Sequence, residues 1–250
     1  MKIVISARPY NPTVGGHIVL HKLCDSLLKQ GLPAYLRPDS TKSWHINPSY
    51  LSQVTHEFDP ENDVAIYHNS IRGNPWRAKK FIRWMLYLPW YETDGVVLYI
   101  HKMFGDGPIL NVTEPFLDVF YDRGLPRQGV CWTWRKANKQ GWKEKDRPKT
   151  GTEIPRGLLQ SDLSTIFNTH HRFVSYDGAT YLSVLAALCG CDSIVMRPVD
   201  GERQLGLARN KQELELARSE WSLLRSNMER EYQEQDVKAA NVIRWAIQQF

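Results

Sequence analysis

Two basic residues directly follow a predicted strand in the second half of the chain. Residues 129–134 alternate as a strand does, and Arg135 and Lys136 stand at its carboxyl end. A guanidinium offers a planar fork of donors and an ammonium a point charge, so both can stabilise a phosphate group whose bond is breaking. The basic run continues to Lys149, which is typical of a solvated loop. We assign the chemistry to Arg135 and Lys136 and expect the rest of the run to be solvated.

A second group of polar residues follows the predicted strand at 172–176. Asp177 supplies a carboxylate, and the neighbouring residues that supply hydroxyls are Ser175, Tyr176, Thr180 and Ser183. Such groups can bind the oxygen-rich edges of a sugar or nucleotide. Isolated hydroxyl residues at these positions also cap helices and form turns, so both roles stay open for them. A helix predicted at 179–188 begins here and ends before Gly190.

A glycine pair precedes the first predicted helix, which covers residues 17–30. Gly15 and Gly16 permit positive φ and a close backbone approach, and the helix start offers N–H groups to an anion; an ordinary turn is the alternative. His17 titrates near neutral pH and is a candidate general base, with local capping as the alternative. His17 and His21 have the spacing of zinc ligands, but no third ligand accompanies them, and the four cysteines lack paired spacing. We expect neither a metal nor another cofactor.

Alternating strands and helices must position these residues. In the first half, the pattern predicts strands at 1–7, 34–36, 63–67 and 96–100 and helices at 17–30 and 76–88. In the second half, it predicts strands at 129–134, 172–176 and 193–196 and helices at 158–167 and 179–188. This alternation is typical of α/β folds with parallel sheets and right-handed crossovers, and we expect the first half to be doubly wound. Two more helices are predicted at 211–228 and 235–250.

The turn-forming residues Gly124 and Pro126 indicate a boundary between two domains. We predict one domain at residues 1–122, a second at 123–232, and a final helical segment at 233–250. A short coiled coil of the last two helices is an alternative, but fewer than three clean heptads make packing on the domains the better prediction.

Composition excludes several classes of protein. Hydrophobic residues make up 42% of the 250 residues and charges of both signs are mixed, which excludes a disordered chain. No apolar run approaches the roughly 18 residues that cross a bilayer, and the N-terminus lacks the pattern of a cleaved export signal. We therefore expect a cytoplasmic protein. The net charge of +5 favours an anionic partner: nucleic acid, anionic lipid or a phosphorylated small molecule.

Three segments resemble one enzyme family. The segment from Phe173 to Val195 resembles the donor-site signature of GT-B fold glycosyltransferases, in which a strand end and loop lead into a helix that stops at a glycine before a short strand. Residues 11–17 resemble the glycine loop of the amino domain in that family, and residues 73–84 look like a helix entry of the same group. The likeness is to the form met in surface-polysaccharide gene clusters and large algal viruses.

The resemblance implies two Rossmann-like parallel-sheet domains that face a cleft, with the C-terminal helices crossing back to the first domain. It implies transfer of a sugar from a nucleoside diphosphate sugar, with UDP-sugars favoured, to a glycan or glycoprotein acceptor without a metal. Arg135, Lys136 and the Asp177 loop would bind the donor, while Gly15, Gly16 and His17 would face the reaction centre. A viral enzyme would act in the host cytoplasm.

One departure from the family pattern concerns the nucleotide ribose. Many retaining members carry an acid at the position of Leu185, which accepts the ribose hydroxyls. Retaining and inverting stereochemistry therefore both stay open, as does weak donor binding. An inverting enzyme would need a base on the first domain, and Glu92, Asp94 and Glu114 compete with His17 for that role.

Two other functions compete with the enzyme. A non-catalytic relative would bind a nucleotide or a glycan without turnover. A nucleic-acid binder would use the basic stretch and the residues Trp132, Trp134 and Trp142, but Glu144 and Asp146 interrupt the charge and no known motif accompanies it. Aromatic residues at 84–91, including Trp90, are expected in the core, with sugar stacking and peripheral membrane contact as the alternatives.

Overall fold

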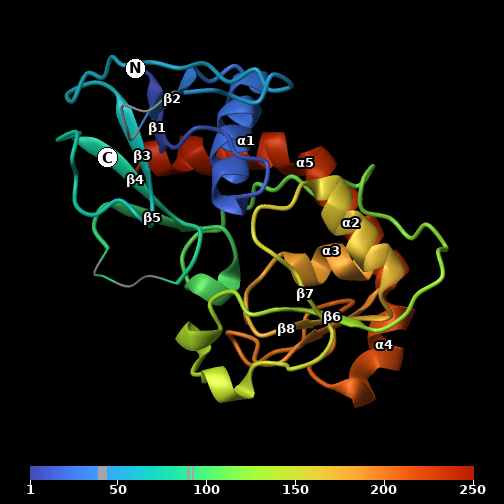
Figure 1. The fold of residues 1–250 in the computed structure, drawn as a ribbon. Coiled ribbons are helices and arrows are strands. Elements are labelled where there is room, and N and C mark those ends of the chain that lie inside the picture. Colours follow the sequence, from blue (N-terminus) through green and yellow to red (C-terminus); the bar gives the residue numbers. More distant parts are fainter. Residues whose placement is uncertain (39–43, 89–90, 92) are drawn as a thin grey trace. The chain divides into compact units, whose positions relative to one another are not determined.

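The computed structural model describes residues 1–38, 44–88, 91 and 93–250. It is an α/β structure with two sheets, and the strands within each sheet are parallel. The chain divides into two units (Figure 1), of which unit 1 comprises Met1–Glu114 with Glu231–Phe250 and unit 2 comprises Pro115–Arg230. The predicted α/β class with parallel sheets is therefore confirmed. Trp90 and Glu92, which the sequence singled out, lie outside the described residues.

Unit 1 is built on a five-stranded sheet in the order β2-β1-β3-β4-β5. Its strands are β1 (Ile3–Ala7), β2 (Ala34–Pro38), β3 (Val64–His68), β4 (Lys80–Met85) and β5 (Val96–Tyr99). Helix α1 (Gly15–Lys29) connects β1 to its parallel neighbour β2 and completes the predicted strand–helix–strand unit. β1 is buried along its whole length because it pairs with β2 on one side and β3 on the other.

The helix predicted at residues 76–88 is wrong, because strand β4 occupies Lys80–Met85. Its side chains alternate: Ile82 and Trp84 join the core that contains α1, whereas Phe81 packs on the opposite face of the sheet. This period of two, carried by aromatic and β-branched residues, favours a strand over a helix. The segment that resembled a helix entry is therefore a loop followed by a strand.

Helices cover only one face of the sheet in unit 1. The core on that face combines residues from β1 to β5 with α1 and with the later part of α5 (Trp221–Ile247). The opposite face is covered by an aromatic cluster made of Phe58, Tyr67, Trp76 and Phe81. No helix is found between β3 and β5 in the residues that the structure describes there. The strand order is that of a doubly wound sheet, as expected for the first half, but helices on the second face are not found among the described residues.

Unit 2 is built on a four-stranded sheet in the order β7-β6-β8-β9. The strands are β6 (Val130–Thr133), β7 (Thr152–Glu153), β8 (Arg172–Ser175) and β9 (Asp192–Val195). Helices α2 (Gln160–Thr169) and α3 (Leu182–Leu188) share one core with Cys131 and Phe173, and α4 (Leu214–Ser219) packs with Ile194 in another. Short 3-10 helices occupy Lys102–Phe104, Ala137–Gln140, Glu144–Asp146 and Lys211–Glu213.

The C-terminal helices differ from the two that were predicted. A short α4 is followed by one continuous helix, α5, instead of separate helices at 211–228 and 235–250. Residues 229–234 contain neither glycine nor proline and are mostly strong helix formers, so nothing interrupts α5 between the two predicted segments. Among the described residues, no helix is both long and apolar enough to cross a membrane.

The structural units begin and end at other residues than the predicted domains. Phe116, Leu117 and Phe120, which were assigned to the domain at 1–122, pack in the core of unit 2. The last part of α5, from Glu231 onward, belongs to unit 1, and its residues Ala239 and Ile243 lie in that unit's core. α5 therefore starts in unit 2 and ends in unit 1.

Candidate functional site

Charged residues follow each of the four parallel strands of unit 2. Arg135 comes after β6, Arg156 after β7, Asp177 after β8 and Arg197 after β9. Because the carboxyl ends of parallel strands meet at one edge of the sheet, these four residues share that edge. In open parallel sheets this edge is where ligands bind.

Lys136 and Asp177 form the centre of this edge. Lys136 Nζ lies 3.7 Å from Asp177 Oδ2, and the other carboxylate oxygen, Oδ1, accepts a hydrogen bond of 3.2 Å from the backbone N–H of Ala179. Asp177 is only 2% exposed, whereas the Lys136 side chain is 42% exposed. Lys136 has φ +56°, a left-handed conformation that residues with a Cβ rarely adopt and that often marks a functional site. The carboxylate thus faces inward and the ammonium remains accessible.

Positive charge is in excess around Asp177. Burial raises the pKa of the Asp177 carboxyl, although Lys136, the N–H of Ala179 and Arg135 oppose this shift. Burial also lowers the pKa of the Arg135 guanidinium, as does its repulsion from Arg156, while Asp177 counteracts both. Two cations, Lys136 and Arg135, therefore face one carboxylate that burial already disfavours as an anion, and a third, Arg156, lies close enough to repel Arg135. An anionic ligand would reduce the repulsion between these cations.

The guanidinium of Arg135 has one hydrogen-bonded end and one end without a partner in the described structure. Its Nη2 donates a hydrogen bond of 2.9 Å to the backbone oxygen of Pro155, next to Arg156. Its Nε is buried and has no hydrogen-bond partner in the described structure. A buried donor without a partner costs free energy, and such groups are found where a ligand or water completes the site.

Two of the predicted hydroxyl residues, Ser175 and Thr180, form hydrogen bonds with nearby backbone groups. Ser175 Oγ donates to the backbone oxygen of Asp177 at 2.7 Å and accepts from the N–H of Asp177 at 3.2 Å. Thr180 Oγ1 accepts from the N–H of Leu182 at 3.4 Å. Ser183 is fully buried, and its Oγ has no hydrogen-bond partner in the described structure. Ser175 and Thr180 thus form the turns that shape the Asp177 loop.

Tyr176 belongs to an aromatic cluster beside the same edge. Its ring centroid lies 4.8 Å from that of Trp134 and 5.1 Å from that of Trp142, and the two indoles are 6.4 Å apart. Both indole Nε1 atoms are buried and lack a hydrogen-bond partner in the described residues. The Arg197 guanidinium covers Trp142 at 3.7 Å from the ring centroid. Because these rings pack on one another, they do not form the exposed platforms that base stacking in a nucleic-acid interface requires.

The remaining predicted residues, Gly15, Gly16 and His17, belong to unit 1. Both glycines are the first residues of α1 and neither has positive φ, so that part of the expectation is wrong. Val14 precedes them as the N-cap and provides no side-chain hydrogen bond, and the first turn carries no acidic residue. A Cβ at Gly15 would meet nothing within 4 Å among the described atoms. The start of α1 is therefore open to a ligand.

His17 is oriented by the backbone before α1. Its Nδ1 lies 3.0 Å from the backbone oxygen of Pro9, which can only accept, so Nδ1 carries the proton in the neutral ring. Nε2 then holds the lone pair that a general base needs. His21 Nε2 donates in the same way to Arg8 at 2.8 Å, and burial lowers the pKa of His21, which keeps its ring neutral. Among the described residues, no three His, Cys, Asp or Glu side chains gather as metal ligands.

The other candidate bases have different surroundings. Glu114 Oε2 accepts hydrogen bonds from the hydroxyls of Tyr50 at 3.1 Å and Tyr232 at 3.2 Å. Asp94 Oδ1 accepts from the buried Arg83 at 3.0 Å. The Glu114 side chain is 13% exposed, whereas that of Asp94 is 57% exposed, and Glu92 lies outside the described residues. His17, whose ring is oriented by the Pro9 carbonyl, stays a predicted candidate base.

Leu185, which stands where many members of the resembling family carry an acid, is a core residue here. It is 4% exposed and packs in the core of unit 2 with residues of α2 and β8. A carboxylate at this position would be buried among apolar side chains, so the local structure suits leucine. The side chain offers nothing to a ribose.

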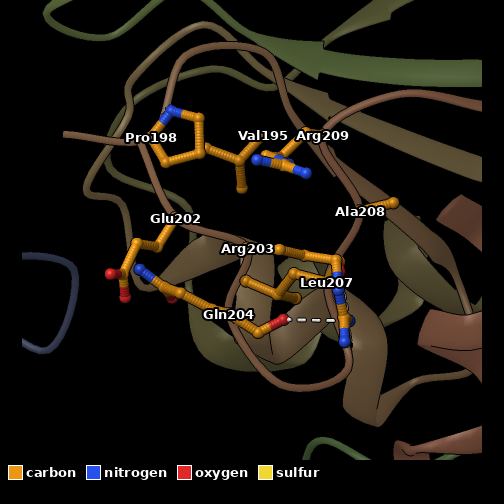
Figure 2. Close-up of a pocket in the computed structure, with 8 residues that line it drawn as sticks. All are labelled: Val195, Pro198, Glu202, Arg203, Gln204, Leu207, Ala208 and Arg209. Atoms are coloured by element: carbon orange, nitrogen blue, oxygen red, sulfur yellow. Dashed lines mark hydrogen bonds between the residues drawn. The ribbon is translucent and has the colours of Figure 1, made fainter. Parts of the chain in front are cut away.

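Two hollows lie in unit 2. The loop after β9 encloses one of about 10 Å³, which suffices for roughly one water; Figure 2 shows its lining residues, Val195, Pro198, Glu202, Arg203, Gln204, Leu207, Ala208 and Arg209. A second, open hollow of about 420 Å³ is lined by Trp132, Val174 and Tyr176 together with the loop through Thr150 and Gly151. Its volume is in the range of small-molecule sites, and Tyr176 connects it to the Asp177 loop.

Two charged residues of this edge were missed by sequence reasoning. Arg156 follows β7, which has only two residues and is too short to show alternation. Arg197 follows β9, a predicted strand, so inspecting every strand's carboxyl end would have found it.

No protein-family model matches this chain, and no curated protein matches it either.

Proposed function

We propose that unit 2 binds a nucleoside diphosphate sugar at the edge formed by Arg135, Lys136 and Arg156, and that the chain transfers the sugar to a hydroxyl of a glycan acceptor. The observation that carries the proposal is the excess of cations around one buried carboxylate, Asp177. A diphosphate is the small anion that fits several cations at the end of a parallel sheet. The enzyme class, GT-B fold glycosyltransferase, rests on the sequence resemblance.

Cations at this edge would act on the leaving group. When the bond between the sugar and the diphosphate breaks, negative charge builds up on the departing phosphate oxygens. Arg135 can donate two hydrogen bonds in a fork, and Lys136 can follow the moving charge as a point charge. The Asp177 carboxylate would hold the Lys136 ammonium in place through their ion pair. In an inverting reaction, Nε2 of His17 would accept the proton of the acceptor hydroxyl, in a cytoplasmic enzyme that needs no metal.

The test is binding and turnover with a panel of UDP-, GDP- and CMP-sugars. The double variant Arg135→Ala, Lys136→Ala should lower affinity by at least about 100-fold, because it removes two charge-assisted interactions of about 1.5–3 kcal/mol each. Calorimetric titration measures the affinity, and release of free nucleotide measures turnover. The matched control is Lys139→Ala, Lys143→Ala, which removes two charges from exposed positions of the same stretch and should leave both unchanged. If the wild type binds no nucleotide or nucleotide sugar, the proposal fails.

A non-catalytic binding protein is the second candidate, and the burial of Leu185 favours it. A protein that lacks a carboxylate for the ribose can still hold the diphosphate through Arg135 and Lys136. Such a protein would bind nucleoside diphosphates and their sugars with similar affinity but would release no nucleotide from them. Turnover by the wild type that His17→Ala abolishes would exclude it.

A further inference from the structure

Three loops at the carboxyl edge of unit 2 are joined by one residue, Arg197. They follow β6, β8 and β9, and they carry the Lys136 segment, the Asp177 turn and Arg197 itself. Backbone hydrogen bonds join the last two: Met196 N–H donates to Ser175 at 3.1 Å and Val199 N–H to Gly178 at 3.3 Å. The backbone of Arg197 lies so close to Gly178 that a Cβ at residue 178 would collide with the Arg197 backbone oxygen.

The side chain of Arg197 reaches the remaining loop. Its Nη1 donates a hydrogen bond of 3.1 Å to the backbone oxygen of Gln140, the last residue of the short helix that Lys136 starts. Its guanidinium also lies 3.7 Å from the centroid of the Trp142 ring, a close cation–π contact. The segment between Lys136 and Gly141 has left-handed backbone at both ends, so it depends on outside contacts to keep its shape.

The loop that presents Arg197 is itself held firmly. Arg203 forms two hydrogen bonds with the Glu220 carboxylate, at 2.7 and 2.6 Å, and Glu220 also accepts from the N–H of Gly206 at 2.8 Å. Arg203 further bonds the backbone oxygens of Gln204, as Figure 2 shows, and of Leu207. A rigid loop of this kind can position a neighbouring segment.

We propose that Arg197 is a positioning residue of the anion site: it holds the segment from Lys136 to Trp142 so that Lys136 stays beside Asp177. Its own charge serves Trp142 and the Gln140 carbonyl and makes no contact with the bound anion. The part of this inference that concerns ligand affinity rests on the proposed function. The part that concerns the segment's order does not.

The first measurement needs no ligand. Amide hydrogen exchange across residues 136–142 is compared between the wild-type chain and Arg197→Leu, which keeps the apolar part of the side chain and removes the donor and the charge. We expect exchange in this segment to become about tenfold faster while exchange in β6 and β8 stays the same. The control is Arg209→Leu, from the same loop, whose guanidinium pairs with Glu213 at 2.6 Å. Unchanged exchange at 136–142 in Arg197→Leu overturns the inference.

The second measurement uses inorganic pyrophosphate and UDP as probes. Arg197→Leu should weaken binding about tenfold without changing how steeply affinity falls with salt, because Lys136 is still present to pair with the probe and only its ordering is lost. Lys136→Ala should weaken binding and flatten that salt dependence. A flattened dependence in Arg197→Leu would show direct contact with the anion and overturn the positioning role. If exchange quickens as expected but the wild type binds neither probe, the role of Arg197 stands and the proposed function fails.

Discussion

Unit 1 and unit 2 each bury a group of charges, but only one of the groups is balanced. In unit 1, Lys22 Nζ lies 3.1 Å from Asp25 Oδ2 and 3.8 Å from Glu114 Oε2, and the rings of Tyr50 and Tyr232 cover it at 5.2 and 5.0 Å. We call these five residues the Lys22 cluster; together with Lys29, whose Nζ lies 2.8 Å from Asp25 Oδ2, they pair two cations with two carboxylates. The cluster connects α1, the loop after β2 and α5 within one unit.

The carboxylates of the two groups respond oppositely to burial. Burial disfavours the charge of Asp25, but hydrogen bonds from Lys29, the N–H of Leu51 and Lys22 outweigh it, and the pKa of Asp25 is lowered. For Asp177 burial prevails, and the pKa is raised. The difference teaches that a closed network of charges stabilises a fold, whereas cations without enough anions leave a site for a ligand.

Replacing Asp25 by alanine should have the largest effect on stability. The change leaves the ammonium of Lys22, which is 3% exposed, without its nearest carboxylate, and breaking a buried pair in this way costs about 3–5 kcal/mol. Urea unfolding measures the loss of unfolding free energy. Asp106→Ala, at an exposed position of unit 1, is the control and should change it by less than about 0.5 kcal/mol. A loss below about 1 kcal/mol for Asp25→Ala would show that the cluster is not a closed network.

Removing one hydroxyl from the Lys22 cluster should have a smaller effect. Burial, followed by the nearby Glu114, raises the pKa of Tyr232 to about 12, so the hydroxyl keeps its proton and donates to Glu114. Tyr232→Phe should cost about 0.5–1.5 kcal/mol of unfolding free energy, the net value of one hydrogen bond. Tyr121→Phe, at a more exposed position of unit 2, should cost almost nothing. Equal losses for both variants would contradict a special role for the cluster.

Among these variants, Asp177→Asn should change the free energy of unfolding least at neutral pH, because the asparagine side chain can still accept a hydrogen bond from the N–H of Ala179. Its effect lies in the pH dependence. A raised folded pKa stabilises the protein below the ordinary value of 3.8, and this contribution is lost as the pH rises through the folded pKa. Asp25, with a lowered pKa, contributes stability above 3.8 and loses it as the pH falls.

Unfolding free energies measured from pH 3 to pH 7 test this contrast. The difference between wild type and Asp177→Asn should fall as the pH rises, whereas the difference between wild type and Asp25→Asn should grow. Subtraction removes the contributions of other groups, such as His21. Slopes of the same sign would show that the two carboxylates do not differ in the way the structure indicates.

Part of the site follows from sequence by a simple geometric rule. Arg135, Lys136 and Asp177 come directly after strands whose alternation is visible, and parallel strands bring their carboxyl ends to one edge. The same rule could not predict Arg156, because β7 has only two residues and shows no alternation in the sequence. It also says nothing of Arg197 binding Trp142, since that contact joins residues far apart in the chain.

In the fold, too, some elements follow from the local sequence and others depend on tertiary pairing. The βαβ unit at the start and the strands β6, β8 and β9 of unit 2 follow from local patterns of two and of 3.6 residues. Residues 76–88 misled sequence reasoning because a short apolar run was assigned a helix although its alternation favours a strand, which pairs with β3 and β5.

The sequence by itself determined the α/β class, the parallel sheets and the position of the basic pair after a strand, because periodicity and turn residues are local properties. Only the tertiary structure decided that Leu185 is a core residue, that Asp177 turns inward toward Lys136, and that the Lys22 cluster with Lys29 pairs two cations with two carboxylates. The physical reason is that burial and the balance of charge depend on neighbours that the folded chain brings from distant positions.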